Sequence, residues 1–252
     1  FDALQTRHMD IIQAVVPSAK TTATQAKVQA LFDELFVLYK KLPQEKEVPQ
    51  ENKDLILSFG EKISMHIMRE VISNASAACA PKFIKTVSSF GKHRPDINLS
   101  IELIKQYFAK LGDVTVCPGF IATDRDTGVM TNLGRGGSDY TASLIAAALG
   151  ADVLEIWTDV DGFMTADPRV ISKSYVIEKL SYIEAMELCN FGAKVIYPPT
   201  IYPAFHENIP VYIKNTFNPS APGTYISNED NSSKQAVKGI SVAISIYNHQ
   251  RP

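Results

Sequence analysis

The sequence predicts a three-layer α/β sandwich around a mostly parallel central β-sheet. Segments with apolar residues at helical spacing alternate with short apolar runs that are typical of strands over most of the chain. With 252 residues, of which 45% are hydrophobic and 21% charged, the chain is long enough for one large domain. A glycine-rich loop at residues 134–137 leads directly into an amphipathic helix, an arrangement typical of anion-binding sites.

The first part of the chain is predicted to be helical. Apolar residues repeat at helical spacing over residues 1–39, with a break at Pro17, and again over residues 52–74, where the longest helix is expected. Gly60 lies inside this helix, where glycine costs about 1 kcal/mol relative to alanine. Either something approaches closely at Gly60 or the helix is imperfect there. The neighbouring Glu61 is by default a solvated charge.

The middle of the chain alternates strands, loops and helices. We expect a short strand over residues 83–87, a basic loop over residues 88–95 and an amphipathic helix over residues 99–111. The apolar run 115–122 is interrupted by a Pro-Gly pair, and residues 124–130 are typical of a hairpin or an exposed loop.

The stretch TNLGRGGSDYTASLIAAALGA, residues 131–151, indicates an anion-binding site. Gly134, Gly136 and Gly137 permit positive φ and close approach of the backbone, so that peptide N–H groups can converge on phosphate or carboxylate oxygens. Arg135 adds a planar donor that can bind a carboxylate with two hydrogen bonds. The alternative is an ordinary turn before a capped helix.

Two residues that follow the glycines, Ser138 and Asp139, occupy positions where a helix N-cap is expected. The dinucleotide fingerprint G-x-G-x-x-G is excluded, because Asp139 occupies the position of the third glycine. A phosphate-binding P-loop is also excluded, since the Gly91-Lys92 pair is followed by His93 rather than by Ser or Thr.

A second group of polar residues follows a predicted strand at residues 153–158. This apolar run is typical of a strand that is buried on both faces. In an open α/β sheet, ligands bind beyond the carboxyl ends of the strands. The candidate binding residues at this end are Thr158, Asp159, Asp161, Asp167 and Arg169. The alternative is a polar loop with an Asp-Gly turn.

The next predicted helix begins with a capping box, because Glu184 lies three residues after Ser181. It leads into FGAKVIYPPT, residues 191–200, where Lys194 lies among apolar neighbours. This lysine either extends to the surface or is held in a site. A further short helix and a strand at residues 209–215 follow.

Composition excludes several classes of protein. The net charge of −2 and the scattered basic residues give no footprint for nucleic acid. Cys79, Cys117 and Cys189 are widely spaced, which argues against a disulfide framework and a zinc site, so we assign no metal ligands. No apolar run approaches the roughly 20 residues of a membrane span. We therefore expect a cytoplasmic protein that binds neither nucleic acid nor a membrane.

The end of the chain is predicted to contain a polar linker at residues 227–236 and the start of a second module at residues 237–252, where apolar residues alternate as in a strand. The chain begins at Phe1 inside a predicted helix, so we expect it to be part of a longer protein.

Four segments in a fixed order carry a family resemblance. They are SFGEKIS (58–64), GFIATD with TNLGRGGSDYTA (119–124 and 131–142), IWTDVDGFMTADPR (156–169) and FGAKVIYPPTIYPA (191–204). Together they resemble the catalytic domain of the aspartate kinases, which are members of the amino-acid kinase family. The resemblance covers roughly residues 1–226 and implies that these form an incomplete amino-acid kinase domain.

The resemblance implies transfer of the γ-phosphoryl group of ATP to the β-carboxylate of L-aspartate, giving 4-phospho-L-aspartate for lysine, threonine and methionine synthesis. Such chemistry needs positioning and positive charge, with Mg²⁺ bridging the phosphates. On the substrate side, Glu61 would pair with the ammonium group, Arg135 would hold the α-carboxylate, and Ser138 would complete the pocket. Asp139 is similar to a catalytic residue that orients lysines, since the attacking carboxylate has no proton to lose.

On the nucleotide side, the resemblance implies that ATP is bound by Thr158, Asp159, Arg169, Lys194 and Val195. Lys194 would also be catalytic, because it would stabilise negative charge on the phosphates in the transition state. Asp161 and Met164 depart from the family pattern, and neither is carried over as a site residue.

Further departures concern the two ends of the chain. The family opens with a strand and a lysine-bearing loop, K-F-G-G-T-S, that this chain does not contain, so we expect that the chain alone could be inactive. Residues from Val237 onward match only the start of a regulatory domain of the ACT type. The family implies homodimers or higher homo-oligomers of the full-length protein, and some relatives are fused to homoserine dehydrogenase.

Two alternatives stay open. Another amino-acid kinase, of the glutamate 5-kinase or acetylglutamate kinase type, would share the fold and the ATP side, but Glu61 and the GRGGSDYTA stretch argue against it. A non-catalytic regulatory or amino-acid-binding chain is supported by the missing lysine loop.

Overall fold

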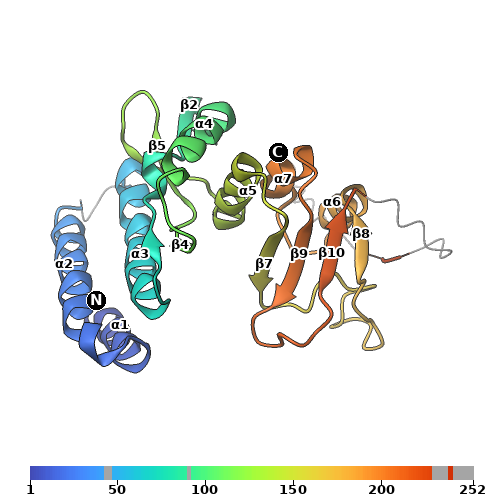
Figure 1. The fold of residues 1–252 in the computed structure, drawn as a ribbon, viewed down its shortest axis with the longest axis horizontal. Helices are drawn as coiled ribbons and strands as arrows, with labels where there is room; N and C mark the ends of the chain where they lie inside the picture. The colour runs from blue at the N-terminus through green and yellow to red at the C-terminus, as the bar shows by residue number, and fades with distance from the viewer. Residues whose placement is uncertain (43–46, 90–91, 229–237, 241–252) are drawn as a thin grey trace, which may run out of the picture. The chain divides into compact units, whose positions relative to one another are not determined.

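The computed structural model describes residues 1–42, 47–89, 92–228 and 238–240. These residues form two compact units, of which the first spans Phe1–Thr141 and the second begins at Ala142 (Figure 1). Most of the predicted linker and of the predicted second module lies outside the described residues, so the expected division of the chain at residues 226 and 236 stays a prediction.

Three long helices open the first unit, as predicted: α1 (Asp2–Val15), α2 (Ser18–Lys40) and α3 (Gln50–Val71). Pro17 separates the first two, because proline has no N–H to donate to the preceding turn. The helices share a core of fully or almost fully buried side chains, each worth about 1.5–3 kcal/mol of burial. These are Ile12, Val16, Val28, Phe32, Ile63 and Ile67.

Two sheets complete the first unit, together with helix α4 (Ile97–Phe108). One pairs β1 (Ser76–Ala77) in parallel with β4 (Thr115–Val116). The other has the order β3-β2-β5-β6, and its strands are β2 (Lys85–Ser89), β3 (Lys92–Pro95), β5 (Ile121–Asp124) and β6 (Met130–Asn132). Strands β2 and β5 are parallel, and the other two pairs are antiparallel.

The expectation of a loop over residues 88–95 is wrong for the described part of that range. Residues 92–95 form a strand that pairs with β2, with Arg94 opposite Val87 and His93 opposite Ser88. The basic side chains hide this strand in the sequence, because strand formation depends on the backbone ladder and on packing more than on intrinsic propensity. The hairpin predicted at residues 124–130 is present between β5 and β6.

The second unit is built on a four-stranded sheet with the order β7-β9-β10-β8 (Figure 1). The strands are β7 (Leu154–Thr158), β8 (Lys179–Ser181), β9 (Val211–Asn215) and β10 (Thr224–Ser227). Its helical elements are most of α5 (Gly137–Leu149), which the boundary between the units crosses, α6 (Tyr182–Asn190), the 3₁₀ turn η2 (Pro198–Ile201) and α7 (Tyr202–His206). The largest side chains of its core are Phe163, Leu180, Tyr182, Ile201 and Ile213.

The predicted capping box at the start of α6 is confirmed. The Ser181 hydroxyl accepts a hydrogen bond from the backbone N–H of Glu184, and the Glu184 carboxylate accepts one from the N–H of Ser181 at 2.7 Å. Both bonds satisfy donors that a helix start otherwise leaves unpaired.

Strand β7 differs from the prediction that it is buried on both faces. Leu154 and Ile156 are buried, but Glu155 and Trp157 on the other face are exposed, Trp157 to 45%. Across the parallel pair with β9, the Lys214 ammonium lies 4.7 Å from the centroid of the Trp157 ring, a favourable cation–π contact. Because tryptophan is counted as apolar, the sequence pattern predicted a buried position. The contact with Lys214 stabilises the ring on the exposed face of the sheet.

The α/β class is confirmed. Of the seven strand pairs in the named sheets of the described residues, four are parallel and three antiparallel. The strands are divided over three sheets, which the sequence did not predict. Within the described part of the chain, none of the helices combines the length and apolar character that crossing a membrane requires.

Candidate functional site

The glycine-rich loop has the backbone geometry that its sequence predicts. Gly134 and Gly136 both have φ of +68°, which a side chain would strain. Gly137 must lack a side chain for another reason, since a Cβ atom there would lie 2.8 Å from the Phe120 ring. The loop therefore depends on glycine at all three positions, whereas its role in holding an anion stays a prediction.

Helix α5 (Gly137–Leu149) begins directly at the last of these glycines. Ser138 and Asp139 therefore lie in its first turn, and the expectation that they occupy the N-cap is wrong. A carboxylate in the first turn interacts favourably with the helix dipole. Burial nevertheless raises the pKa of the Asp139 carboxyl above its ordinary value. Ser138 is exposed.

Glu61 lies on α3 and is half-buried. Burial raises the pKa of its carboxyl, and no hydrogen bond or ion pair reaches it from the part of the chain that the structure describes. A Cβ atom on the neighbouring Gly60 would meet no described atom within 4 Å. No described segment of the protein approaches at Gly60. Whether a group outside the described residues approaches there or the helix is imperfect is not decided by these contacts.

Two residues that the sequence did not single out contact the glycine-rich loop. Phe120 has φ of +69°, which is unusual for a bulky residue, and its carbonyl accepts a hydrogen bond from the Leu133 N–H. Asn132 accepts a hydrogen bond from the Gly134 N–H at 2.9 Å. The asparagine two residues before a glycine is the sequence signal that could have identified it.

The substrate-side candidates thus all belong to the first unit. Arg135 is exposed in the loop, and α3, which carries Glu61, packs against β6, the strand that leads into the loop. The arrangement can offer a guanidinium, a hydroxyl and carboxylates to a small zwitterion.

The nucleotide-side candidates belong to the second unit. Thr158 is the last residue of β7, and its hydroxyl donates a 3.2 Å hydrogen bond to Asp159. Asp161 accepts hydrogen bonds from the side chains of Asn215, the last residue of β9, and Asn218. These residues lie at the carboxyl ends of two parallel strands, the predicted position for ligand-binding groups.

A charged group in the same unit contains Asp167, Arg169 and Lys194. The Arg169 guanidinium lies 2.7 Å from the Asp167 carboxylate and lowers the pKa of that carboxyl to about 2, and the charge of Lys194 acts in the same direction. Lys194 is exposed, and the neighbouring Val195 is half-buried. The Arg169 side chain is 79% exposed, so this pair adds little stability and mainly limits where the guanidinium can lie.

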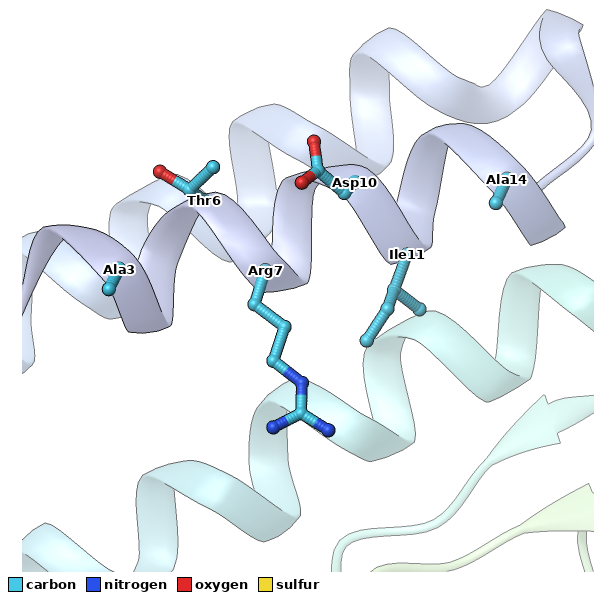
Figure 2. A pocket seen from close by; sticks show the side chains of 6 residues that line it. All are labelled: Ala3, Thr6, Arg7, Asp10, Ile11 and Ala14. Atoms are coloured by element: carbon cyan, nitrogen blue, oxygen red, sulfur yellow. The ribbon is translucent and has the colours of Figure 1, made fainter.

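A hollow in the first unit lies elsewhere, along one side of α1 (Figure 2). Figure 2 shows the six side chains of α1 that line it: Ala3, Thr6, Arg7, Asp10, Ile11 and Ala14. None of the predicted site residues lines it.

In the described ranges, no group of three or more His, Cys, Asp or Glu residues could hold a metal ion.

Comparison with known proteins defines the class. The sequence model of the Amino acid kinase family matches residues 4–215, and the chain belongs to this family. The predicted resemblance to the aspartate kinases is confirmed by curated relatives. The chain is 39% identical over 221 residues to the bifunctional aspartokinase/homoserine dehydrogenase of Haemophilus influenzae, covering 86% of this chain and 27% of that protein. It is 40% identical over 182 residues to the lysine-sensitive aspartokinase 3 of Escherichia coli, covering 70% of this chain and 40% of that protein.

Solved structures agree. The chain matches E. coli aspartokinase III in complex with aspartate and ADP with a TM-score of 0.82 and 31% identity over 92% of its length. It matches the same enzyme in complex with lysine and aspartate with a TM-score of 0.80 and 32% identity. The predicted amino-acid kinase fold is therefore confirmed. The chain covers 52% of those chains.

Proposed function

We propose that this chain is the catalytic core of an aspartate kinase. It transfers the γ-phosphoryl group of ATP to the β-carboxylate of L-aspartate and yields 4-phospho-L-aspartate and ADP. The observation that carries this proposal is the match to E. coli aspartokinase III, whose solved structure holds aspartate and ADP. The backbone geometry of the loop at Gly134–Gly137 supports it, because that loop suits the recognition of an anionic substrate.

On the substrate side, Glu61 pairs with the ammonium group of aspartate. Its half-buried carboxylate lacks a described partner, and a cation would offset the cost of burying its charge. Arg135 holds the α-carboxylate with two parallel hydrogen bonds, and the exposed Ser138 hydroxyl completes the pocket. Recognition of both charged groups at the α-carbon leaves the β-carboxylate to react.

In the chemical step, an oxygen of the β-carboxylate attacks the γ-phosphorus while the bond to the β,γ-bridging oxygen breaks, and ADP leaves with that electron pair. No proton has to be removed from the attacking group. Asp139 therefore acts as a fixed negative charge that orients lysine side chains and does not act as a general base. Most of the rate acceleration comes from positioning and electrostatic stabilisation.

On the nucleotide side, Thr158, Asp159, Arg169, Lys194 and Val195 bind ATP. Lys194 stabilises the negative charge that spreads over the phosphate oxygens in the transition state. Mg²⁺ would be held mainly by phosphate and water oxygens and would need few ligands from the protein. It would supply positive charge against the phosphate oxygens.

The wider role follows from the same proposal. The product would serve lysine, threonine and methionine synthesis, and the full-length protein would form a homodimer or a higher homo-oligomer. Its cytoplasmic location and the absence of nucleic-acid and membrane partners stay predictions.

The test traps the acyl phosphate as a hydroxamate. The protein at its natural full length is incubated with ATP, Mg²⁺ and hydroxylamine, and L-aspartate is compared with L-glutamate and N-acetylglutamate. We expect hydroxamate with aspartate alone, a large loss of kcat in Lys194→Ala, and normal activity in Lys173→Ala, which changes an exposed and unassigned lysine.

Three results would contradict the proposal. Preference for glutamate or acetylglutamate would assign the chain to another amino-acid kinase activity. Aspartate binding in calorimetry without hydroxamate would favour a non-catalytic amino-acid-binding chain. Full activity in Lys194→Ala would remove that residue from the mechanism.

A further inference from the structure

One side-chain amide in the first unit connects two segments that are far apart in the sequence. Asn132 is the last residue of β6. Its Nδ2 group donates a 2.5 Å hydrogen bond to Oδ1 of Asp54 on α3, and its Oδ1 accepts a 2.9 Å hydrogen bond from the backbone N–H of Gly134. Each end of the amide is thus bonded to a different segment.

The Asp54 end fixes the orientation of this amide. Asp54 is only 1% exposed, and its Oδ1 also accepts a 2.6 Å hydrogen bond from the Gln50 side chain. Its Oδ2 has no hydrogen bond among the described residues, although Nε2 of His93 lies 3.5 Å away. A buried carboxylate is costly unless donors surround it. The nitrogen of the Asn132 amide must therefore face α3, which leaves its oxygen for the loop.

The Gly134 end fixes the start of the glycine-rich loop. The bond from Gly134 to the side chain two residues earlier closes a turn that resembles a backbone turn. It forms where Gly134 enters the left-handed region, with φ of +68°. The next residue is Arg135, so the turn sets the point from which the arginine side chain extends.

The hydrogen bond between Asn132 and Asp54 also affects the position of Glu61 on α3. This residue follows Asp54 by seven positions, about two helical turns, and therefore lies on the same side of α3, about 10 Å further along the axis. A rigid helix held at Asp54 is also held at Glu61. The bonds through Asn132 thus connect the helix that carries Glu61 with the loop that carries Arg135.

We propose that Asn132 is a positioning residue that holds Glu61 and Arg135 at the spacing which the two charged groups on the α-carbon of aspartate require. This inference rests on the proposed function. Asn132 touches neither reacting group, and it acts through the segments to which it is bonded. Its loss should weaken aspartate binding and leave ATP binding unchanged.

The experiment exchanges the two partners in the protein at its natural length. Asn132→Ala removes both bonds, and Asn132→Asp places a second carboxylate against the buried one of Asp54. In the double variant Asn132→Asp with Asp54→Asn, the amide is at position 54 and can donate to the new carboxylate, which still accepts from Gly134. We expect KM for aspartate to rise about tenfold or more in both single variants at position 132, equivalent to at least one lost hydrogen bond to a charged group. The double variant should return to within about threefold of the wild-type value.

Two further readouts separate positioning from general damage. KM for ATP should stay constant, and the exchange rate of the Gly134 amide hydrogen, measured without substrate, should rise in Asn132→Ala and recover in the double variant. The matched control is Gln106→Ala, which removes an exposed amide-to-carboxylate hydrogen bond with Glu102 elsewhere in the first unit. It should change none of these quantities.

Failure of this inference is distinguishable from failure of the proposed function. An active wild type whose KM for aspartate is unchanged in Asn132→Ala, or not restored in the double variant, overturns the positioning role. An equal rise of KM for ATP overturns it too. A wild type that does not phosphorylate aspartate refutes the proposed function together with the substrate role, and the Gly134 exchange rate then decides whether the connection itself exists.

Discussion

The hydroxyl of Ser88 on β2 donates a 2.7 Å hydrogen bond to the carboxylate of Asp124 at the end of β5. Asp124 is 4% exposed, and its other oxygen accepts hydrogen bonds from the N–H groups of Asp126 and Thr127 and from the Thr127 hydroxyl. One buried carboxylate therefore joins two neighbouring strands and closes the turn toward β6. These hydrogen bonds hold the pKa of Asp124 well below its usual range, and the bond from Ser88 has the largest effect.

This depressed pKa predicts acid sensitivity. Asp124 stabilises the fold above about pH 4, the usual pKa of an unfolded aspartate, and this contribution is lost as the pH falls below that value toward the folded-state pKa. Asp124→Asn should lower the free energy of unfolding at neutral pH by about 1–3 kcal/mol and should flatten its decline in acid. Urea unfolding over a pH series measures both effects.

Asp126→Asn is the control for Asp124, because it removes an exposed carboxylate from the same turn. Its unfolding should follow the wild-type pH dependence. An acid decline in Asp124→Asn as steep as that of the wild type would show that other carboxylates are responsible.

Arg135→Lys tests whether the loop binds its substrate through two parallel hydrogen bonds. Lysine keeps the positive charge but loses the planar fork that matches a carboxylate. We expect KM for aspartate to rise about 10- to 100-fold, with KM for ATP unchanged. Arg125→Lys, at an exposed arginine that is paired with Asp96, should behave as the wild type. Equal activity of Lys and Arg at position 135 would mean that a point charge is sufficient.

Asp139→Asn should separate activity from stability. Because burial raises the pKa of Asp139, its ionised form costs folding free energy at neutral pH, and the cost disappears as the pH falls and the carboxyl is protonated. The neutral amide should therefore increase the free energy of unfolding at pH 7. If the charge orients lysines during phosphoryl transfer, kcat should fall about 10²- to 10³-fold.

The control for Asp139 is Asp152→Asn at an exposed position, for which neither activity nor stability should change. A loss of stability in Asp139→Asn would show that the carboxylate is a structural acceptor. Unchanged kcat would remove it from the mechanism.

Local signals in the sequence predicted much of the fold and one part of the candidate site. Pro17 separates two helices, Ser181 and Glu184 form the capping box, and Gly134 has the positive φ expected of it. Each is determined by residues a few positions apart, so the chain itself carries the information.

Features that depend on distant contacts were not predictable in this way. The pairing of residues 92–95 with β2, and the cation–π contact at Trp157, need a strand partner that the sequence does not identify. The connection through Asn132 joins residues separated by 78 positions. In the sequence, an asparagine before a glycine-rich loop predicts only a turn. Its hydrogen bond to Asp54 forms because α3 packs against β6, a contact that the sequence does not identify.

Gly60→Ala tests whether Gly60 keeps space for the substrate or is an imperfection of helix α3. A Cβ atom at this position has open space, and alanine is favoured over glycine in a helix by about 1 kcal/mol, so the free energy of unfolding should rise by about that amount. If the glycine keeps space for the substrate beside Glu61, KM for aspartate should rise at the same time while KM for ATP does not. Urea unfolding and steady-state kinetics on the same variant give both values.

The matched control is Gly150→Ala, where a Cβ atom also has open space but φ is +61°. There the alanine should destabilise the fold, because a residue with a Cβ atom is strained at this positive φ. A stabilised Gly60→Ala protein with unchanged KM for aspartate would show that the glycine is an imperfection of the helix. A rise in KM would instead mean that glycine is kept at this position because it gives the substrate access beside Glu61, although it costs the helix about 1 kcal/mol of stability.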